Sequence, residues 1–292
     1  MKKVISWLTA LLLFIPLWAQ AFSAVMWQPQ LRDRQITPTQ WQQLMQQLPK
    51  QGVDTLVLQW SRYGDALSAP VDQQWLLARA QDARRAGLKL VIGLYADPEF
   101  FTRQHQPDSA VTQYFDRLRR EDRQQAAQWV KVLGSEAIGG WYLSAEIDDL
   151  RWRTPAAQQL LVSWLTKSHQ DLAQIADKPI AVSSFFAGNM APQQYRDMLN
   201  LLAGSGVKLW VQDGRGVGKL STAQSQLYLD AITACPHPAV SAVIYERFIS
   251  QADGHSFAPM TGPAPAKVLG CSNDSVLFEL RYLPEARGIM EY

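Results

Sequence analysis

The sequence predicts an α/β protein made of a single (β/α)8 barrel preceded by a signal peptide. Short β-rich apolar runs alternate with helical patterns along the chain, and eight such runs can be counted. No Gly/Ser-rich, Pro-rich or long charged tract divides the 292 residues, and barrels of about 250 residues commonly form one domain. The alternative, an open doubly wound sheet, more usually has five or six strands and a Gly-rich first turn.

The predicted strands are the apolar, β-rich runs, and the predicted helices begin at capping residues. Thr37 precedes Pro38, and Thr154 precedes Pro155, which is the usual order at a helix start. The strands are residues 24–28, 55–60, 89–95, 140–145, 180–186, 207–212, 239–245 and 275–280. The helices are residues 38–49, 72–86, 110–133, 155–175, 192–202 and 222–233, with a short helix before Gly270.

The first 21 residues have the order of a secretory signal peptide. Lys2 and Lys3 precede an apolar run over residues 4–18, and Ala19 and Ala21 provide an A-x-A cleavage site. An uncleaved membrane anchor is the alternative, but a full span needs roughly 20 apolar residues. We expect a mature barrel domain over residues 22–292, periplasmic or secreted, without stable membrane insertion.

The charge balance argues against a polyanionic partner. The chain has 28 Lys and Arg and 26 Asp and Glu, and loss of Lys2 and Lys3 with the signal makes the two numbers equal. A net charge near zero argues against nucleic acid or anionic membrane as the main partner. The sequence leaves the oligomeric state open.

Carboxylates stand at the ends of several predicted strands. In this fold the chemistry lies on the loops that follow the strands. Glu146 ends the fourth strand, Glu246 the seventh, Asp213 the sixth and Glu279 the eighth. A charged group at such a place needs an ion pair, solvent or a ligand. A salt-bridge network with nearby arginines at the rim is the alternative to a catalytic role.

The positions of Glu146 and Glu246 suit glycoside hydrolysis. This reaction needs two carboxyl groups that flank the scissile bond, one as acid and the other as nucleophile or base. We expect Glu146 to be the acid/base and Glu246 the nucleophile, with Asp213 as a further catalytic candidate. Asp148 and Asp149 follow Glu146 after one intervening residue and, together with Glu279, are candidates for substrate binding.

Aromatic residues cluster at the same predicted end of the barrel. Flat rings there suit sugar faces, whose C–H groups stack on the π surface. Core or lid packing is the alternative for each ring alone. The candidates for a carbohydrate groove are Trp27, Trp60, Tyr63, Tyr95 and Trp152.

The two cysteines, Cys235 and Cys271, each lie four residues before a predicted strand, the seventh and the eighth. These neighbouring positions lie at the end of the barrel that serves stability. Export would make a structural disulfide between them chemically possible, and two free buried thiols are the alternative.

Other chemistries fit less well. The run over residues 214–219 lacks the P-loop pattern, because Asp213 and Leu220 stand where Gly and Ser/Thr belong, so we expect a Gly-rich loop over the mouth. No G-x-S-x-G elbow is present. The four histidines have no metal-ligand spacing, so we expect no metal and no cofactor.

Three segments resemble a known bacterial family, domain of unknown function 4434. They are QWSRYG at residues 59–64, GLYADPEFF at 93–101, and the stretch from GWY at 140–142 to EIDD at 146–149. The resemblance covers roughly residues 25–282 and implies a barrel similar to glycoside hydrolases.

The chain also resembles, more loosely, the large clan of retaining glycosidases whose catalytic glutamates follow strands four and seven. Glu146 and Glu246 match these by position. Those enzymes usually carry asparagine directly before the first glutamate, to bind the sugar 2-hydroxyl, whereas this chain has Ala145.

The sequence therefore predicts a glycoside hydrolase acting on a poly- or oligosaccharide of the bacterial envelope. A non-catalytic carbohydrate-binding barrel is the second hypothesis, and it would need the aromatic groove without matched carboxylates. A structural or protein-interaction barrel, with its mouth filled by its own loops, is the third.

Overall fold

The structure is a computed structural model that describes residues 22–253, 256–261, 271 and 274–291. The predicted signal peptide and the predicted short helix before Gly270 lie outside these residues.

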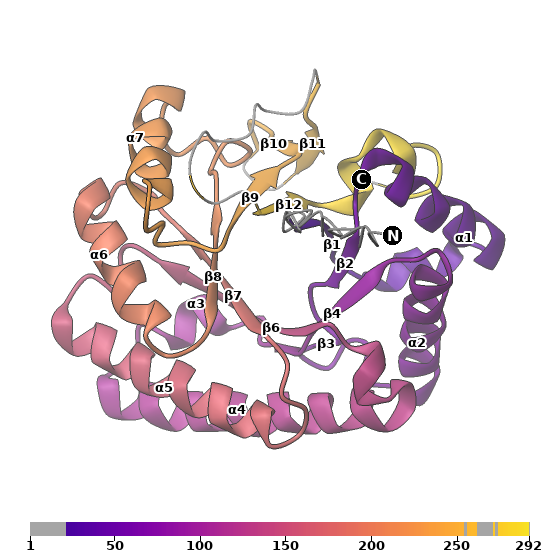
Figure 1. Cartoon of the computed structure of the whole chain (residues 1–292), viewed down its shortest axis with the longest axis horizontal. Coiled ribbons are helices and arrows are strands. Elements are labelled where there is room, and N and C mark those ends of the chain that lie inside the picture. Colours follow the sequence, from indigo (N-terminus) through magenta and orange to yellow (C-terminus); the bar gives the residue numbers. More distant parts are fainter. Residues whose placement is uncertain (1–21, 254–255, 262–270, 272–273, 292) are drawn as a thin grey trace, which may run out of the picture.

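Among the described residues, eight parallel strands close into a barrel, which confirms the predicted fold (Figure 1). The ring closes where the first strand pairs with the last, with Ala24 opposite Val276. The barrel strands are β1 (Ser23–Trp27), β2 (Thr55–Leu58), β4 (Lys89–Gly93), β6 (Gly140–Asp148), β7 (Ile180–Phe185), β8 (Lys208–Gln212), β9 (Ala242–Glu246) and β12 (Asp274–Phe278). The predicted fourth and seventh strands are therefore β6 and β9.

Helices connect the strands and surround the barrel (Figure 1). The predicted caps are confirmed, because the hydroxyls of Thr37 and Thr154 accept hydrogen bonds from the backbone N–H of Gln40 and Ala157. No described helix combines the length and apolar character needed to cross a bilayer. The helices are α1 (Pro38–Gln47), α2 (Pro70–Arg85), α3 (Phe100–Arg103), α4 (Asp108–Leu133), α5 (Pro155–Ala173), α6 (Pro192–Ala203) and α7 (Thr222–Thr233).

Short secondary elements follow some of the barrel strands. β3 (Arg62–Tyr63) pairs with β5 (Tyr95–Ala96), and β10 (Phe248–Ser250) pairs with β11 (Phe257–Pro259). They extend the wall of the barrel beyond the carboxyl ends of β2, β4 and β9. The 3-10 turns are Leu31–Gln35, Leu48–Gln51, Ser135–Ala137, Leu280–Tyr282 and Pro284–Ala286.

Side chains alternate along each barrel strand between the interior and the layer under the helices. The interior is filled by a compact cluster in which Tyr142 stacks on Trp210, with ring centroids 5.6 Å apart. On β9, Ala242 and Ile244 belong to this cluster, so Glu246, two residues further on, lies on the same inner face. The alternation thus directs Glu246 into the barrel and not toward the helices.

Cys235 and Cys271 form a disulfide, with their Cα atoms 5.1 Å apart. The bridge joins the segments that lead into β9 and β12, as predicted from the positions of the two residues. Disulfides form and persist in oxidising compartments, so this bond favours such a location.

Candidate active site

Glu146 lies on β6, where the pairing with β7 shifts register. Leu143 pairs with Val182, but the next pair joins Glu146 to Ser183, so β6 has two extra residues between them. Such a bulge re-aims side chains next to functional sites. Since two residues are inserted, the in-and-out alternation is kept and Glu146 stays on the inner face with Ser183.

Glu246 ends β9 and is buried, with 1% of its surface exposed. Its Oε2 accepts hydrogen bonds from the backbone N–H of Gly216, at 2.5 Å, and of Val217, at 3.2 Å. The Gly-rich loop over residues 214–219 therefore folds against this carboxylate.

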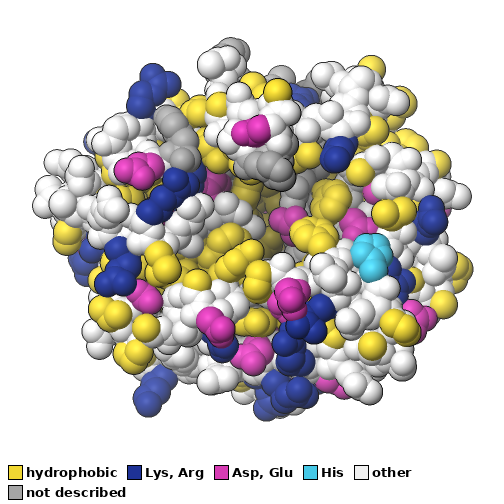
Figure 2. Space-filling model, turned by 180° about the vertical axis from the view of Figure 1, so that it is seen from behind, with side chains coloured by type: hydrophobic (Ala, Val, Ile, Leu, Met, Phe, Trp, Pro, Cys, Tyr) yellow, Lys and Arg dark blue, Asp and Glu magenta, His cyan; other side chains and the backbone are white. Residues whose placement is uncertain are grey.

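Glu146 and Glu246 line the same cavity, which has a volume of about 260 Å³. One face of the molecule is hollowed near its middle, with hydrophobic and acidic side chains around the hollow (Figure 2). The other residues that line the cavity are Phe185, Phe186, Ala187, Gln212, Gly214, Val217, Lys219, Leu220 and Ser225. The cavity thus combines two carboxyl groups with a largely apolar wall.

Burial, together with the charges of Asp213 and Glu146, raises the pKa of Glu246 to about 7. The N–H groups of Gly216 and Val217 oppose this rise, because they stabilise the ionised form. The pKa of Glu246 thus lies where its carboxyl group can ionise near neutral pH.

Burial also raises the pKa of Glu146, and a hydrogen bond from the side chain of Gln212 opposes that rise. Two carboxyl groups with raised pKa values in one cavity do not both ionise easily. Glu246 receives two backbone N–H groups, so its ionised form is the better stabilised of the pair.

Asp213, predicted to be catalytic, lies behind the cavity wall and is fully buried. Its Oδ1 accepts backbone N–H groups from Arg215 and Glu246, both at 3.3 Å. Burial raises its pKa to about 6, although the neighbouring N–H groups and the charges of Arg215 and Arg247 oppose the rise. Asp213 joins the Gly-rich loop to β9 and is not among the residues that line the cavity, and its catalytic role stays a prediction.

Glu279, predicted to bind substrate, is fully buried in an ion pair with Arg281. Its Oε2 accepts the backbone N–H of Gln28 at 3.0 Å, and Arg281 also reaches Asp33 at 3.3 Å. The partners of Glu279 are thus all internal. The arginine that neutralises Glu279 stands two residues further along the chain, in line with the salt-bridge alternative.

Asp148, another predicted substrate ligand, is also committed to internal bonds. Its Oδ1 accepts the backbone N–H of Leu150 at 2.8 Å and of Arg151 at 2.5 Å. Its Oδ2 accepts the side-chain amide of Gln104 at 2.8 Å. These bonds shape the turn after β6, so Asp148 has a structural place.

Asp149 is fully buried and joins this turn to the loop after β7. Asn189 donates to it from both its backbone and its side chain, each at 2.8 Å. The predicted contact of Asp149 with substrate is therefore corrected to a link between two loops.

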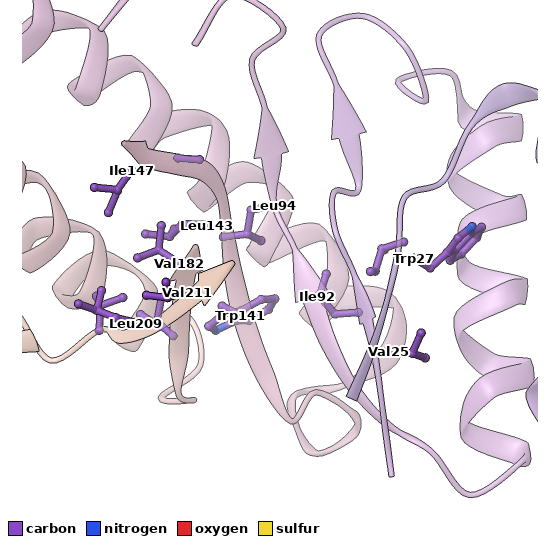
Figure 3. Packing of buried hydrophobic residues seen from close by; sticks show 14 of the residues in the cluster. Val25, Trp27, Ile92, Leu94, Trp141, Leu143, Ile147, Val182, Leu209 and Val211 are labelled. Atoms are coloured by element: carbon purple, nitrogen blue, oxygen red, sulfur yellow. The ribbon is translucent and has the colours of Figure 1, made fainter. Parts of the chain in front are cut away.

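Trp27 and Trp152, predicted to stack on sugar, belong to the core. Trp27 projects from β1 toward the neighbouring helix (Figure 3), and its indole N–H donates to Asp33 at 3.2 Å. Trp152 is fully buried and donates to the side chain of Gln104 at 3.2 Å. Neither ring has a free face for a ligand, so both predictions are wrong.

Trp60, Tyr63 and Tyr95 keep exposed surface on β3, β5 and the residues beside them. The rings of Trp60 and Tyr63 lie 4.9 Å apart, and 39% of Tyr63 is exposed. The guanidinium of Arg62 lies over the ring of Tyr95, 5.1 Å from its centroid. None of the three rings lines the cavity with Glu146 and Glu246.

The structure adds site residues that the sequence analysis missed. Gln212 shares the inner face of β8 with Trp210 and bonds Glu146, which its alternate position on the strand could have indicated. The N–H groups of Gly216 and Val217 are backbone atoms, and no side-chain pattern could have revealed their target. Among the described residues, no group of three or more His, Cys, Asp or Glu side chains is arranged to hold a metal ion.

Solved structures with the same architecture include proteins described as glycosidases. A "putative alpha-L-fucosidase" from Bacteroides thetaiotaomicron has a TM-score of 0.58 and 15% identity, covering 89% of this chain and 87% of that one. The catalytic domain of a beta-amylase from Paenibacillus polymyxa has a TM-score of 0.55 and 10% identity, covering 92% and 95%. At such identities these likenesses show the fold alone, a glycoside-hydrolase-like barrel.

Sequence comparison gives a much nearer relative. "Uncharacterized protein YbcH" of Escherichia coli (strain K12) is 48% identical over 299 residues, which cover the whole of both chains. The family model described as "Domain of unknown function (DUF4434)" matches residues 22–269. With most of its length matched, as its motifs predicted, the chain belongs to the DUF4434 family.

Proposed function

We propose that this protein is a glycoside hydrolase that cleaves a poly- or oligosaccharide of the bacterial envelope. The observation that carries the proposal is that Glu146 and Glu246 line one cavity at the carboxyl ends of β6 and β9. Active sites of this fold lie at that end of the barrel. The fold shared with the fucosidase and the beta-amylase supports the proposal at the level of architecture.

In the proposed reaction Glu146 is the general acid and Glu246 the nucleophile. Glu146 gives its proton to the glycosidic oxygen while a carboxylate oxygen of Glu246 bonds to the anomeric carbon, and the leaving sugar departs as an alcohol. Glu146, now ionised, takes a proton from water, whose oxygen attacks the same carbon and releases Glu246. This retaining mechanism requires the two carboxyl groups to lie about 5–5.5 Å apart.

The shifted pKa values support this division of roles. A general acid must hold a proton near the working pH, and burial raises the pKa of Glu146. A nucleophile must be ionised, and the two N–H groups at Oε2 favour the ionised form of Glu246. Ala145 stands where related enzymes bind the sugar 2-hydroxyl, so another group must supply that contact here.

A place outside the cytoplasm is part of the same proposal. The predicted signal peptide would export the chain, and the disulfide between Cys235 and Cys271 is stable in an oxidising compartment. The predicted substrate is therefore a glycan that the protein meets in the periplasm or outside the cell.

The test is a screen of the purified mature protein against bacterial exopolysaccharides and cell-wall glycans, with new reducing ends as the signal. The wild type should release fragments from at least one glycan, and Glu146→Gln and Glu246→Gln should each lower the rate about 10³-fold or more. A substitution on the surface, Glu136→Gln, serves as the control, since that side chain is 96% exposed. Full activity in either active-site variant would contradict the assignment.

A non-catalytic carbohydrate-binding barrel is the second candidate, and one observation favours it. Trp60 and Tyr63 form an aromatic patch outside the cavity, where a glycan could stack without reaching the two glutamates. Calorimetry with a glycan that binds distinguishes the two functions. Turnover that is lost in Glu146→Gln with binding retained supports the enzyme, whereas binding without any turnover by the wild type supports the binding protein.

A further inference from the structure

The Gly-rich loop between β8 and α7 directs two consecutive backbone N–H groups at one oxygen of Glu246. The nitrogens of Gly216 and Val217 lie 2.5 Å and 3.2 Å from Oε2. Among the described residues, both hydrogen bonds that we find to this carboxylate reach Oε2, and neither occupies Oε1. A buried carboxylate held on one side by fixed donors has one orientation and one free oxygen.

From this geometry we infer that Gly216 and Val217 are positioning residues, whose N–H groups hold Oε2 of Glu246 so that Oε1 is presented to the anomeric carbon. The inference rests on the proposed function for the reaction itself. The hydrogen bonds and their effect on Glu246 do not depend on it.

Gly216 is the residue that allows the loop to approach so closely. A Cβ atom at this position would lie 2.6 Å from the backbone oxygen of Phe248 and 2.9 Å from Oε2 of Glu246. Contacts this short to backbone cannot be relieved by a side-chain rotation. Any other residue would push the loop away from the carboxylate.

The loop is fixed on both sides, so its N–H groups are directed before any ligand arrives. Ser250 of β10 donates its N–H to the backbone oxygen of Gly216 at 2.8 Å. At the base of the loop, Asp213 accepts the N–H groups of Arg215 and Glu246. Donors that are oriented in advance cost no reorganisation during the reaction.

Burial and the neighbouring carboxylates oppose the ionisation of Glu246, which is why the two N–H groups matter. Glu146 on β6 and Asp213 after β8 both act to keep Glu246 protonated. Arg215 and Arg247 lower the pKa of Asp213, and Lys219 lines the cavity from the loop. The donors at Oε2 act against the two carboxylates to stabilise the charge that a nucleophile needs.

The test compares two substitutions at one position. Val217→Pro removes the N–H that reaches Oε2, whereas Val217→Ala keeps it and trims a side chain that is 42% exposed. Carbon-13 NMR of the glutamate carboxyl groups, assigned with Glu246→Gln, reports the pKa of Glu246 directly. We expect Val217→Pro to raise that pKa by about one unit and Val217→Ala, which keeps the N–H, to change it far less.

Kinetics on a glycan that is cleaved give the second measurement. Val217→Pro should lower kcat about 10-fold with little change in KM, and should shift the acidic limb of the kcat–pH profile upward. If the wild type cleaves a glycan but Val217→Pro matches Val217→Ala in both measurements, the positioning role is overturned and the proposed function stands. If no glycan is cleaved, the titration still decides the positioning role.

A third measurement needs no variant of the loop. In the folded wild-type protein the amide signals of Gly216 and Val217 should shift with the titration of Glu246, and this shift should be absent in Glu246→Gln. Amide signals whose chemical shifts do not change during the titration of Glu246 would overturn the inference, even if Val217→Pro does not fold.

Discussion

Asp149 and Asn189 join the loops that follow β6 and β7 by two hydrogen bonds, each 2.8 Å long. Asp149 is fully buried, and the N–H of Met190 provides a third donor at 3.3 Å. These bonds fix the turn three residues beyond Glu146, so the contact holds one wall of the candidate site in place.

We expect Asp149→Ala to destabilise the fold by about 2–3 kcal/mol, because it leaves buried donors of Asn189 and Met190 unpaired. Urea unfolding followed by circular dichroism measures the change. Asn189→Ala should lower the free energy of unfolding by less when Asp149 is already replaced, and a double-mutant cycle measures this difference. Equal costs in the two backgrounds would show that the pair does not act as described.

Asp122 on α4 should make the stability of the fold depend on pH. It is buried, it accepts the N–H of Tyr95 at 3.1 Å, and burial raises its pKa to about 8. An unfolded chain would ionise this group near pH 4, so folding holds a proton that the unfolded state releases. The raised pKa of Asp122 therefore stabilises the folded state fully below about pH 4, and this stabilisation is lost as the pH rises toward 8.

Asp122→Asn should remove this loss, since the amide never ionises and its oxygen can still accept the N–H of Tyr95. Between pH 5 and pH 8, we expect the free energy of unfolding of the wild type to fall by at least about 1 kcal/mol more than that of this variant. Urea unfolding at both pH values measures it, with the exposed Asp65→Asn as the control. Parallel stability curves for Asp122→Asn and wild type would contradict the account.

Tyr63 and Trp152 should separate binding from stability. Tyr63 is 39% exposed in the aromatic patch, whereas Trp152 is fully buried and stacks on Phe115 with centroids 5.8 Å apart. Tyr63→Ala should weaken glycan binding about 5- to 10-fold at nearly unchanged stability. Trp152→Phe should lower stability by about 1–3 kcal/mol with affinity unchanged.

Calorimetry with a bound glycan and urea unfolding of both variants measure these effects. The two variants act as controls for each other. Affinity lost in Trp152→Phe and kept in Tyr63→Ala would reverse the placement of the binding surface.

The disulfide closes a loop of 36 residues between Cys235 and Cys271. Loop-closure entropy predicts that its removal costs about 3–4 kcal/mol. A reductant and the double Cys→Ser variant should lower the melting temperature to a similar extent. Thiol titration of the unreduced protein should find no free thiol. Two titratable thiols in the unreduced protein would contradict the assignment.

The barrel could be predicted from the sequence because apolar runs and helix caps are local signals. The ends of some strands could not be predicted. The predicted strand over residues 239–245 begins only at Ala242, because the N–H of Ala239 bonds the backbone oxygen of Ile232 at the end of α7. The run from 55 to 60 leaves the barrel after Leu58 and continues to β3.

The two glutamates could be placed because alternation along a strand shows which face a residue occupies. Many partners of the polar groups could not be predicted, because they come from distant parts of the chain. Asn189 lies 40 residues from Asp149, and Gln104 lies 48 residues from Trp152. Without these partners, buried structural groups and open ligand sites give the same pattern in sequence.

The central claim is that Glu246 is the nucleophile and Glu146 its acid/base partner. The most direct test is to trap the intermediate with a 2-deoxy-2-fluoro glycoside of the sugar released in the glycan screen, and to locate the label by peptide mass spectrometry. We expect one sugar bound per chain, attached to Glu246, and none in Glu246→Gln. A label on another residue, or a product of inverted anomeric configuration without any label, would contradict it.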